Sequence, residues 1–185
     1  MGKMIECVVD SVRVSLTNQD RVMVLKDKGS ERYLPIWIGI YEAESITIAL
    51  QKIAVARPLT HDLIPELLNQ LGIQLVCAEI TAIESDTFYA DLVLEQNGER
   101  KYIDCRPSDA VAIIVRSQVP LYVDEEVFTK AGIIPEEAER GEAIELSPST
   151  ENRQEGDLSL FEDFLKSLDD DEDSSENDKP EDLPF

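Results

Sequence analysis

The sequence predicts an α+β fold built on a mixed, mainly antiparallel sheet with packed helices. Two groups of three strand-like segments are separated by two helical segments and followed by two further helical ones. Strands that come in groups, rather than in strict alternation with helices, are typical of α+β domains. At 185 residues the chain is long enough for one domain with extensions, and we place that domain at residues 1–135.

The first group of strands covers residues 4–17, 22–25 and 33–38. Apolar side chains alternate in the first segment, and the alternation changes parity near Asp10 and Ser11, which predicts a β-bulge or a bend. The turns between the segments are short and polar, so the three strands are expected to form a meander. Because Pro35 has no N–H for a ladder, the third strand is expected to lie at the edge of the sheet or to be locally irregular.

Two helical segments follow the meander. In the first, apolar residues recur with helical spacing at Ala43, Ile46, Ala49, Leu50 and Ile53. In the second, Asp62 is the expected N-cap, which places Pro65 at the third helical position, where no intrahelical bond needs its N–H. Gly72 is expected to end this second helix.

The second group of strands covers residues 73–83, 87–94 and 100–105. The last two are joined by Gln96-Asn97-Gly98, a strong hairpin signal. Pro107 fits the first turn of a helix that is apolar on nearly every side, so this helix is expected to be buried. A short strand at 121–123 then precedes a brief helix, which Asp124 caps and Gly132 ends.

Beyond residue 135 the composition changes. Residues 136–157 have the composition of a linker. Residues 158–168 predict an amphipathic helix whose apolar stripe consists of Leu158, Phe161, Leu165 and Leu168. Residues 169–185 form an acidic tail that cannot bury itself and is expected to be disordered.

The formal net charge of -22 is concentrated in this C-terminal extension. Residues 1–135 carry 13 Lys and Arg against 20 Asp and Glu, or -7, and residues 136–185 carry 4 against 19, or -15. Such a field repels nucleic acid, because nonspecific affinity comes from Lys and Arg that neutralise phosphates. Nucleic acid can therefore bind only through a local basic site, a bound cation, or both.

Cysteine usage and hydropathy indicate the compartment. Three cysteines, an odd number, stand in apolar or strand-like surroundings, which indicates reduced thiols. The first residues lack the long apolar run of a signal peptide, and no later segment approaches the roughly 18 apolar residues of a membrane span. We therefore expect a cytoplasmic protein with no membrane contact.

The residues that could carry chemistry are mostly acids and arginines. His61 is the single histidine, so zinc sites with several histidines are excluded, and a serine triad is possible only through this residue. The remaining set suits metal-assisted phosphodiester hydrolysis, in which carboxylates hold Mg²⁺ or Mn²⁺, arginine grips phosphate and His61 moves protons. Its other members are Glu42, Glu44, Asp62, Asp104, Asp109, Arg57 and Arg106.

Each of these residues also has a structural explanation. Asp62 can serve as an N-cap, and Asp109 as a first-turn acid that the helix dipole favours. Arg57 and Arg106 can pair with those acids and hold two helix starts together. His61 can be a hydrogen-bonded, partly buried side chain, and the two glutamates beside the first helix can simply be solvated.

Four blocks of sequence stand in a recognisable order. They are LPIWIG at 34–39 with Glu42 and Ala43, RPLTHDL at 57–63, TFYA at 87–90 and DCRPSDAVA at 104–112. Together they resemble the bifunctional nuclease domain family over about residues 4–135. The resemblance implies an α+β domain that can self-associate, and a nuclease activity on both DNA and RNA that is ascribed to some members. The acidic insertion before the C-terminus departs from the family pattern.

The matching positions give the predicted site. We assign catalysis to His61, Asp62, Asp109 and Glu42, and metal binding to Asp62 and Asp109, with Mg²⁺ or Mn²⁺ as the cation. We assign substrate binding to Arg57, Thr60, Arg106 and Ser108. Because each Arg-Pro block precedes a helix, we predict a composite site between two helix N-termini, with both arginines facing one anionic ligand.

The alternative is a noncatalytic binding or regulatory protein, in which the same polar residues bind a ligand or organise the fold. Its support is the acidic extension, which ends Pro-Glu-Asp-Leu-Pro-Phe at 180–185. This ending resembles the acidic tip of bacterial single-stranded-DNA-binding proteins, which docks on basic pockets of replication and repair enzymes. It predicts a protein partner for the tail.

Overall fold

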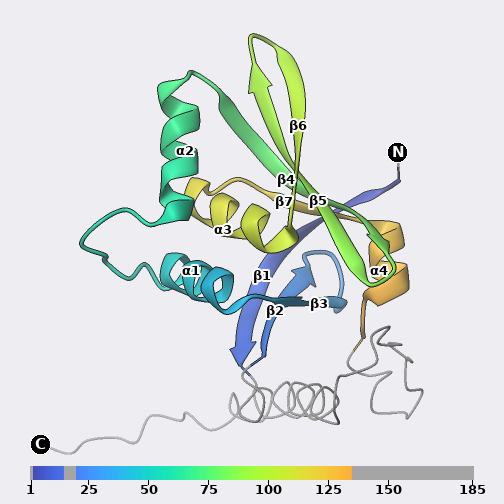
Figure 1. The fold of residues 1–185 in the computed structure, drawn as a ribbon. Helices are drawn as coiled ribbons and strands as arrows, with labels where there is room; N and C mark the ends of the chain where they lie inside the picture. The colour runs from blue at the N-terminus through green and yellow to red at the C-terminus, as the bar shows by residue number, and fades with distance from the viewer. Residues whose placement is uncertain (1, 15–19, 135–185) are drawn as a thin grey trace, which may run out of the picture.

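The chain folds around one seven-stranded sheet (Figure 1). The structure, a computed structural model, describes residues 2–14 and 20–134, so the calls for 136–157, 158–168 and 169–185 lie outside the described residues. In chain order the elements are β1 (Met4–Val14), β2 (Arg21–Asp27), β3 (Tyr33–Ile38), α1 (Ile40–Leu50), α2 (Thr60–Gln70), β4 (Gln74–Glu84), β5 (Thr87–Gln96), β6 (Glu99–Cys105), α3 (Pro107–Ser117), β7 (Leu121–Asp124) and α4 (Glu125–Ala131).

The strands lie in the order β3-β2-β1-β7-β4-β5-β6. Every neighbouring pair is antiparallel except β4 and β7, which are parallel. The predicted α+β class and mainly antiparallel sheet are therefore confirmed. The short strand β7 lies at the centre of the sheet, where it joins the two groups of three strands. Its existence was predicted from the sequence, but its central place was not.

Three local features of the strands agree with the sequence. The register of β1 against β2 shifts between Val9 and Ser11, which confirms the bulge. β3 is an edge strand, as Pro35 requires. Asn97 and Gly98 have φ values of 56° and 80°, which is the positive-φ backbone of a tight hairpin turn.

The helix boundaries correct two predictions. α2 begins at Thr60, so Asp62 is its third residue rather than its N-cap, and Pro65 is the sixth residue rather than the third. The Asp62 carboxylate still satisfies the helix start, because it accepts the backbone N–H of Leu59 at 2.6 Å. α1 ends at Leu50, so Ile53 lies outside the helix in which its spacing placed it.

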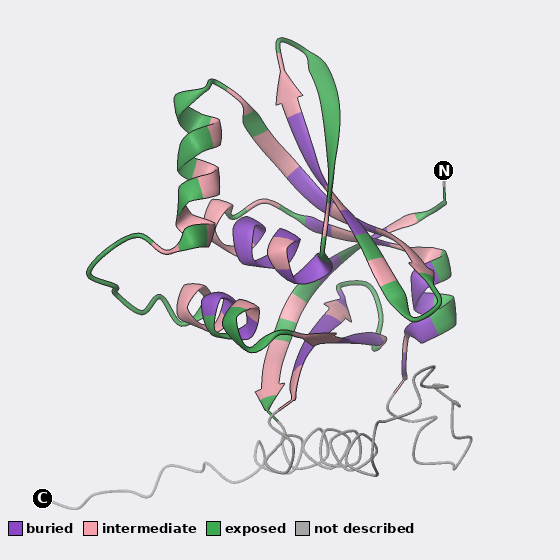
Figure 2. Cartoon of the chain, in the orientation of Figure 1, coloured by how far each residue is buried: buried purple, intermediate pink, exposed green. Residues whose placement is uncertain are grey.

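The starts of the other two helices agree with the sequence. Pro107 is the first residue of α3, and Asp124 caps α4 by accepting the backbone N–H of Glu126 at 2.8 Å. α3 is the central helix, since it packs against α1, α2, β4 and β5. Its residues 110–114 are buried, as predicted, whereas α2 contains no fully buried residue (Figure 2).

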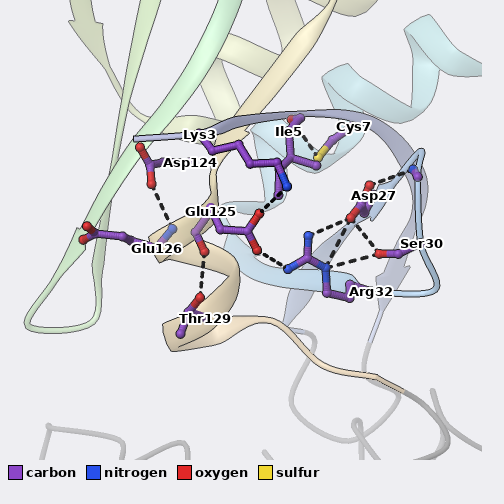
Figure 3. A network of polar contacts seen from close by, with 11 residues as sticks. Lys3, Ile5, Cys7, Asp27, Ser30, Arg32, Asp124, Glu125, Glu126 and Thr129 are labelled. Carbon is purple, nitrogen blue, oxygen red and sulfur yellow. Dashed lines mark hydrogen bonds and ion pairs between the residues drawn. The ribbon is translucent and has the colours of Figure 1, made fainter. Parts of the chain in front are cut away.

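A polar network fastens the β2–β3 turn to α4 (Figure 3). Asp27 is buried and accepts bonds from the Gly29 backbone at 2.7 Å, from Ser30 at 2.7 Å and from Arg32 at 2.9 Å. Arg32 also donates to Glu125 of α4 at 2.6 Å. Burial alone would raise the pKa of Asp27, but these hydrogen bonds outweigh it and lower the pKa. The network holds α4 against the β2–β3 turn at this end of the sheet.

The three cysteines are free thiols, as expected. Burial, the largest cause, raises the pKa of Cys7 to about 12 and the pKa values of Cys77 and Cys105 to about 11. These thiols are therefore protonated and unreactive at neutral pH. No helix within residues 2–14 and 20–134 is both long and apolar enough to span a membrane.

Candidate functional site

The polar residues of three helices meet around Arg106, the N-cap of α3. Its Nε donates to Asp109 Oδ2 at 2.7 Å, and its Nη2 donates to Asp109 Oδ1 at 3.0 Å and to Glu42 Oε1 at 2.6 Å. Glu42 lies in the first turn of α1, and a Cβ at the preceding N-cap, Gly39, would overlap its carboxylate. Arg106 thereby joins the starts of α1 and α3, while 64% of its side chain stays exposed.

His61 extends this cluster toward the interior. Its Nε2 lies 3.4 Å from Asp109 Oδ1, and its Nδ1 lies 2.8 Å from Ser45 Oγ. An ionised carboxylate only accepts, so in the neutral ring Nε2 carries the proton and the Ser45 hydroxyl donates to Nδ1. Ser45 is 6% exposed and the His61 side chain 17%, so a continuous chain of polar contacts runs from buried Ser45 to exposed Arg106.

Asp62 belongs to a second ion pair. Its carboxylate accepts Nε of Arg116, which lies near the end of α3 and has a side chain 10% exposed. Arg116 also donates to the carbonyl of Ala112 at 2.7 Å and to that of Ser45 at 3.2 Å. This pair joins α1, α2 and α3, and it directs Asp62 away from the role predicted beside Asp109.

Both aspartates of the predicted site are held in the charged form. Burial alone would raise the pKa of Asp109, but hydrogen bonds from Arg106 and His61 outweigh it, and the pKa is lowered. The pKa of Asp62 is also lowered: burial opposes the shift, while the Leu59 amide and Arg116 produce it. Hydrogen bonds to Asp109 and then to Glu42 raise the pKa of Arg106 further above its ordinary range.

The predicted site residues fall into two sets. The structure brings together Glu42, His61, Arg106 and Asp109. Arg57 and Thr60 are exposed in and after the α1–α2 loop, and neither side chain has a partner in the part of the chain that the structure describes. Ser108 is buried at the second position of α3. A single anion facing both Arg57 and Arg106 remains a prediction.

Two residues that contact the predicted site residues His61 and Asp62 were not predicted from the sequence. Ser45 lies three positions after Glu42 in α1, and Arg116 lies seven positions after Asp109 in α3. Both spacings put the paired residues on one helix face, which is the signal that could have found them. Apart from this spacing, the sequence around Ser45 and Arg116 gave no hint of a role in the site.

The carboxylates do not fit a divalent cation in this arrangement. Oxygens of Glu42, Asp62 and Asp109 accept hydrogen bonds from arginine. Among the described residues, no three His, Cys, Asp or Glu side chains are grouped as a metal centre would require. Metal binding by Asp62 and Asp109 therefore stays a prediction, and no chemical step below depends on it.

A cleft of about 670 Å³ lies elsewhere, beside the polar network of Figure 3. Its charged lining residues are paired with each other or with neighbours: Lys3 with Glu125, Lys28 with Glu6, Arg32 with Asp27, and Glu31 with Lys26. A ligand there would have to break these ion pairs. The cluster around Arg106 is the better candidate site.

Comparison with known proteins identifies the family of this chain. The bifunctional nuclease domain matches residues 23–136, which include every residue of the cluster. The chain belongs to the bifunctional nuclease domain family. This confirms the resemblance seen in the four sequence blocks.

Relatives of the bifunctional nuclease domain occur in bacteria and plants. An uncharacterized protein of Mycobacterium tuberculosis is 38% identical over 164 residues, covering 88% of this chain and 94% of that protein. Bifunctional nuclease 1 of Oryza sativa subsp. japonica is 28% identical over 139 residues, covering 71% of this chain and 42% of the rice protein. Bifunctional nuclease 2 of Arabidopsis thaliana is 27% identical over 106 residues, covering 55% of this chain and 32% of that protein.

Proposed function

We propose that this protein is a nuclease that hydrolyses phosphodiester bonds of DNA and RNA at the cluster of Glu42, His61, Arg106 and Asp109. Membership of the bifunctional nuclease domain family supports the reaction class. The observation that carries the proposal is the exposed guanidinium of Arg106 next to a histidine and two carboxylates. Arg106 is the one cation of this cluster, and a phosphate can bind it where its guanidinium is exposed or by displacing Glu42.

Arg106 is the phosphate-binding residue of this proposal. Its Nε and Nη2 are held by Asp109 and Glu42, and no residue that the structure describes accepts a bond from Nη1. A phosphate oxygen can therefore bind Nη1, and a second oxygen can replace Glu42 at Nη2 in a bidentate contact. The displaced Glu42 carboxylate would then lie beside the phosphate, where it can accept a proton from water.

His61 is the proton-handling residue. A proton added at Nδ1 produces an imidazolium whose Nε2–H faces the Asp109 carboxylate. Ser45 can accept as well as donate, so its hydroxyl stays hydrogen-bonded in both states of the ring. The imidazolium can then give its Nε2 proton to a leaving oxygen that takes the place of Asp109, and the neutral ring keeps its Nδ1 proton, which Ser45 accepts.

The nuclease is tested with purified full-length protein on single-stranded RNA and DNA. We expect cleavage that falls by about 10²-fold or more in Arg106→Ala and His61→Ala, with folding checked by circular dichroism. Arg100→Ala, which removes an exposed arginine from β6, is the matched control and should retain activity. Equal activity in all variants would contradict the site.

The expectation from the sequence that cleavage needs Mg²⁺ or Mn²⁺ is tested in the same assay. Each cation is titrated after treatment with EDTA, for the wild type and for Asp62→Asn and Asp109→Asn. A cation held by Asp62 and Asp109 predicts that both variants need more metal for half-maximal activity. Cleavage that persists in EDTA would contradict the expected requirement for a divalent cation.

A noncatalytic binding protein is the second candidate function. It is favoured by one observation: Arg106 is already neutralised by Glu42 and Asp109, as in an ion pair that fixes the starts of two helices. Self-association and a protein partner for residues 180–185 are further proposals. Light scattering tests the first, and a pull-down with and without residues 180–185 tests the second.

A further inference from the structure

The face of the β2–β3 hairpin that points away from the main core is apolar. Cross-strand pairs put Val22 opposite Trp37 and Val24 opposite Pro35, on one side of the sheet. The alternate residues of the two strands point to the other side of the sheet and belong to the main core: Met23, Leu25, Leu34 and Ile36. We call Val22, Val24, Tyr33, Pro35 and Trp37 the outer hairpin face.

The outer hairpin face is more buried than its described neighbours explain. Val22 is 4% exposed and Val24 is 1% exposed. Within residues 2–14 and 20–134, the cluster that they form is completed only by Tyr33, Ile133 and the partly buried Trp37. Strands that are buried on both faces lie between two layers. All three of these neighbours lie in the hairpin or beside it at one edge, so we expect a further layer of chain over this face.

The chain itself leads to this face. After α4, Ile133 forms a bridge with Tyr33, with backbone hydrogen bonds of 2.8 and 2.9 Å in the two directions. The last described residue, Ile134, follows directly, so the described part of the chain ends beside β3.

We propose that residues 158–168 dock on the outer hairpin face of their own chain. Their apolar side chains repeat at i, i+3, i+7 and i+10, which gives a helix one apolar stripe of the size the face needs: Leu158, Phe161, Leu165 and Leu168. Acidic residues Glu162 and Asp163 stand between them. The apolar stripe therefore matches the outer hairpin face in its apolar character.

The connecting segment is long enough for this docking. Residues 135–157 can span up to about 75 Å when extended, and a flexible chain of this length has an average end-to-end distance of about 27 Å. A tether of this kind raises the local concentration of the stripe to the millimolar range. Docking in cis is therefore favoured over docking between copies at ordinary protein concentrations.

Trp37 makes the proposal measurable, because it is the single tryptophan of the chain. Its indole Nε1 is buried and has no hydrogen-bond partner among the described residues. In full-length protein, Leu165→Asp should expose the indole, shift its emission to longer wavelength and raise acrylamide quenching several-fold. Ser167→Asp adds the same charge on the opposite side of a helix and should leave both signals at their wild-type values.

Hydrogen exchange provides a second, independent measurement. The amides of residues 158–168 should be protected in the wild type, and Val22→Asn on the hairpin face should remove that protection while the core strands stay protected. Unchanged quenching in Leu165→Asp together with unprotected amides at 158–168 would overturn the proposal. Quenching that falls as protein concentration rises would also overturn it, by indicating that a second copy covers the face. If Leu16→Asp exposes Trp37 and Leu165→Asp does not, the proposal is also overturned, because the segment between β1 and β2 then covers the face.

Discussion

Arg116 of α3 binds the carboxylate of Asp62, a residue 54 positions earlier in the first turn of α2. The same guanidinium reaches the carbonyl of Ser45 in α1 at 3.2 Å. One side chain thus fixes the three helices that carry the candidate site. The Asp62–Arg116 pair positions His61, the neighbour of Asp62, without touching the proposed phosphate position.

Removal of this ion pair should destabilise the domain. Asp62→Ala leaves the guanidinium of Arg116, which is 10% exposed, without its charge partner and the Leu59 amide without its acceptor. We expect a loss of about 2 kcal/mol in the free energy of unfolding, measured by urea denaturation. Glu66→Ala in the same helix removes an exposed carboxylate that bonds Gln70, and its effect should stay within about 0.5 kcal/mol. Equal losses in both variants would contradict the assigned role.

Acid should weaken the domain through the two site aspartates. The pKa values of Asp62 and Asp109 are lowered in the folded protein, so the unfolded chain binds protons first as the pH falls. Their stabilisation is complete above the ordinary carboxyl pKa of about 3.9. It is lost as the pH falls below that value toward the folded-state pKa. The urea midpoint of the wild type should therefore drop more steeply below about pH 4 than that of Asp62→Asn or Asp109→Asn. If the urea midpoints of the wild type and both variants fall equally with pH, the lowered pKa values of Asp62 and Asp109 are contradicted.

Arg106→Lys separates charge from geometry at the proposed phosphate site. Lysine keeps the positive charge but lacks the planar fork that can hold two phosphate oxygens. We expect cleavage to fall about tenfold or more, while stability changes by less than about 1 kcal/mol because the Arg106 side chain is largely exposed. Wild-type activity in the lysine variant would show that a point charge is sufficient.

Local chemistry in the sequence predicted much of the fold. Pro35 indicated an edge strand, Asn97-Gly98 a hairpin, and Pro107 and Asp124 two helix starts, because each of these residues restricts its own backbone or caps a neighbour's. The prediction of Asp62 as an N-cap was wrong because an acid at the third position of a helix can also accept a backbone N–H at the helix start.

Long-range pairing could not be predicted in the same way. β7 has only four residues, and its central place depends on its pairing with β1 and β4, which no local pattern encodes. At the candidate site, the sequence blocks that resemble the family indicated His61, Arg106 and Asp109. The contacts of Ser45 and Arg116 arise from helix packing, which the sequence alone did not reveal.

The last prediction concerns two like charges that face each other across β5 and β6. Asp91 and Asp104 are direct partners in the register. Burial, and then the charge of Asp104, raise the pKa of Asp91. Like charges directly opposite are destabilising, so Asp104→Asn should stabilise the domain by about 0.5 kcal/mol at pH 7.

The pH dependence and a matched variant identify the cause of this gain. The gain should fade as the pH falls through the raised pKa of Asp91, because protonated Asp91 no longer repels its partner. Glu99→Gln removes one charge from the same strand, but Glu99 is paired with neutral Gln96. If Glu99→Gln stabilises the domain as much as Asp104→Asn does, the gain comes from the general negative charge of the protein rather than from the Asp91–Asp104 pair.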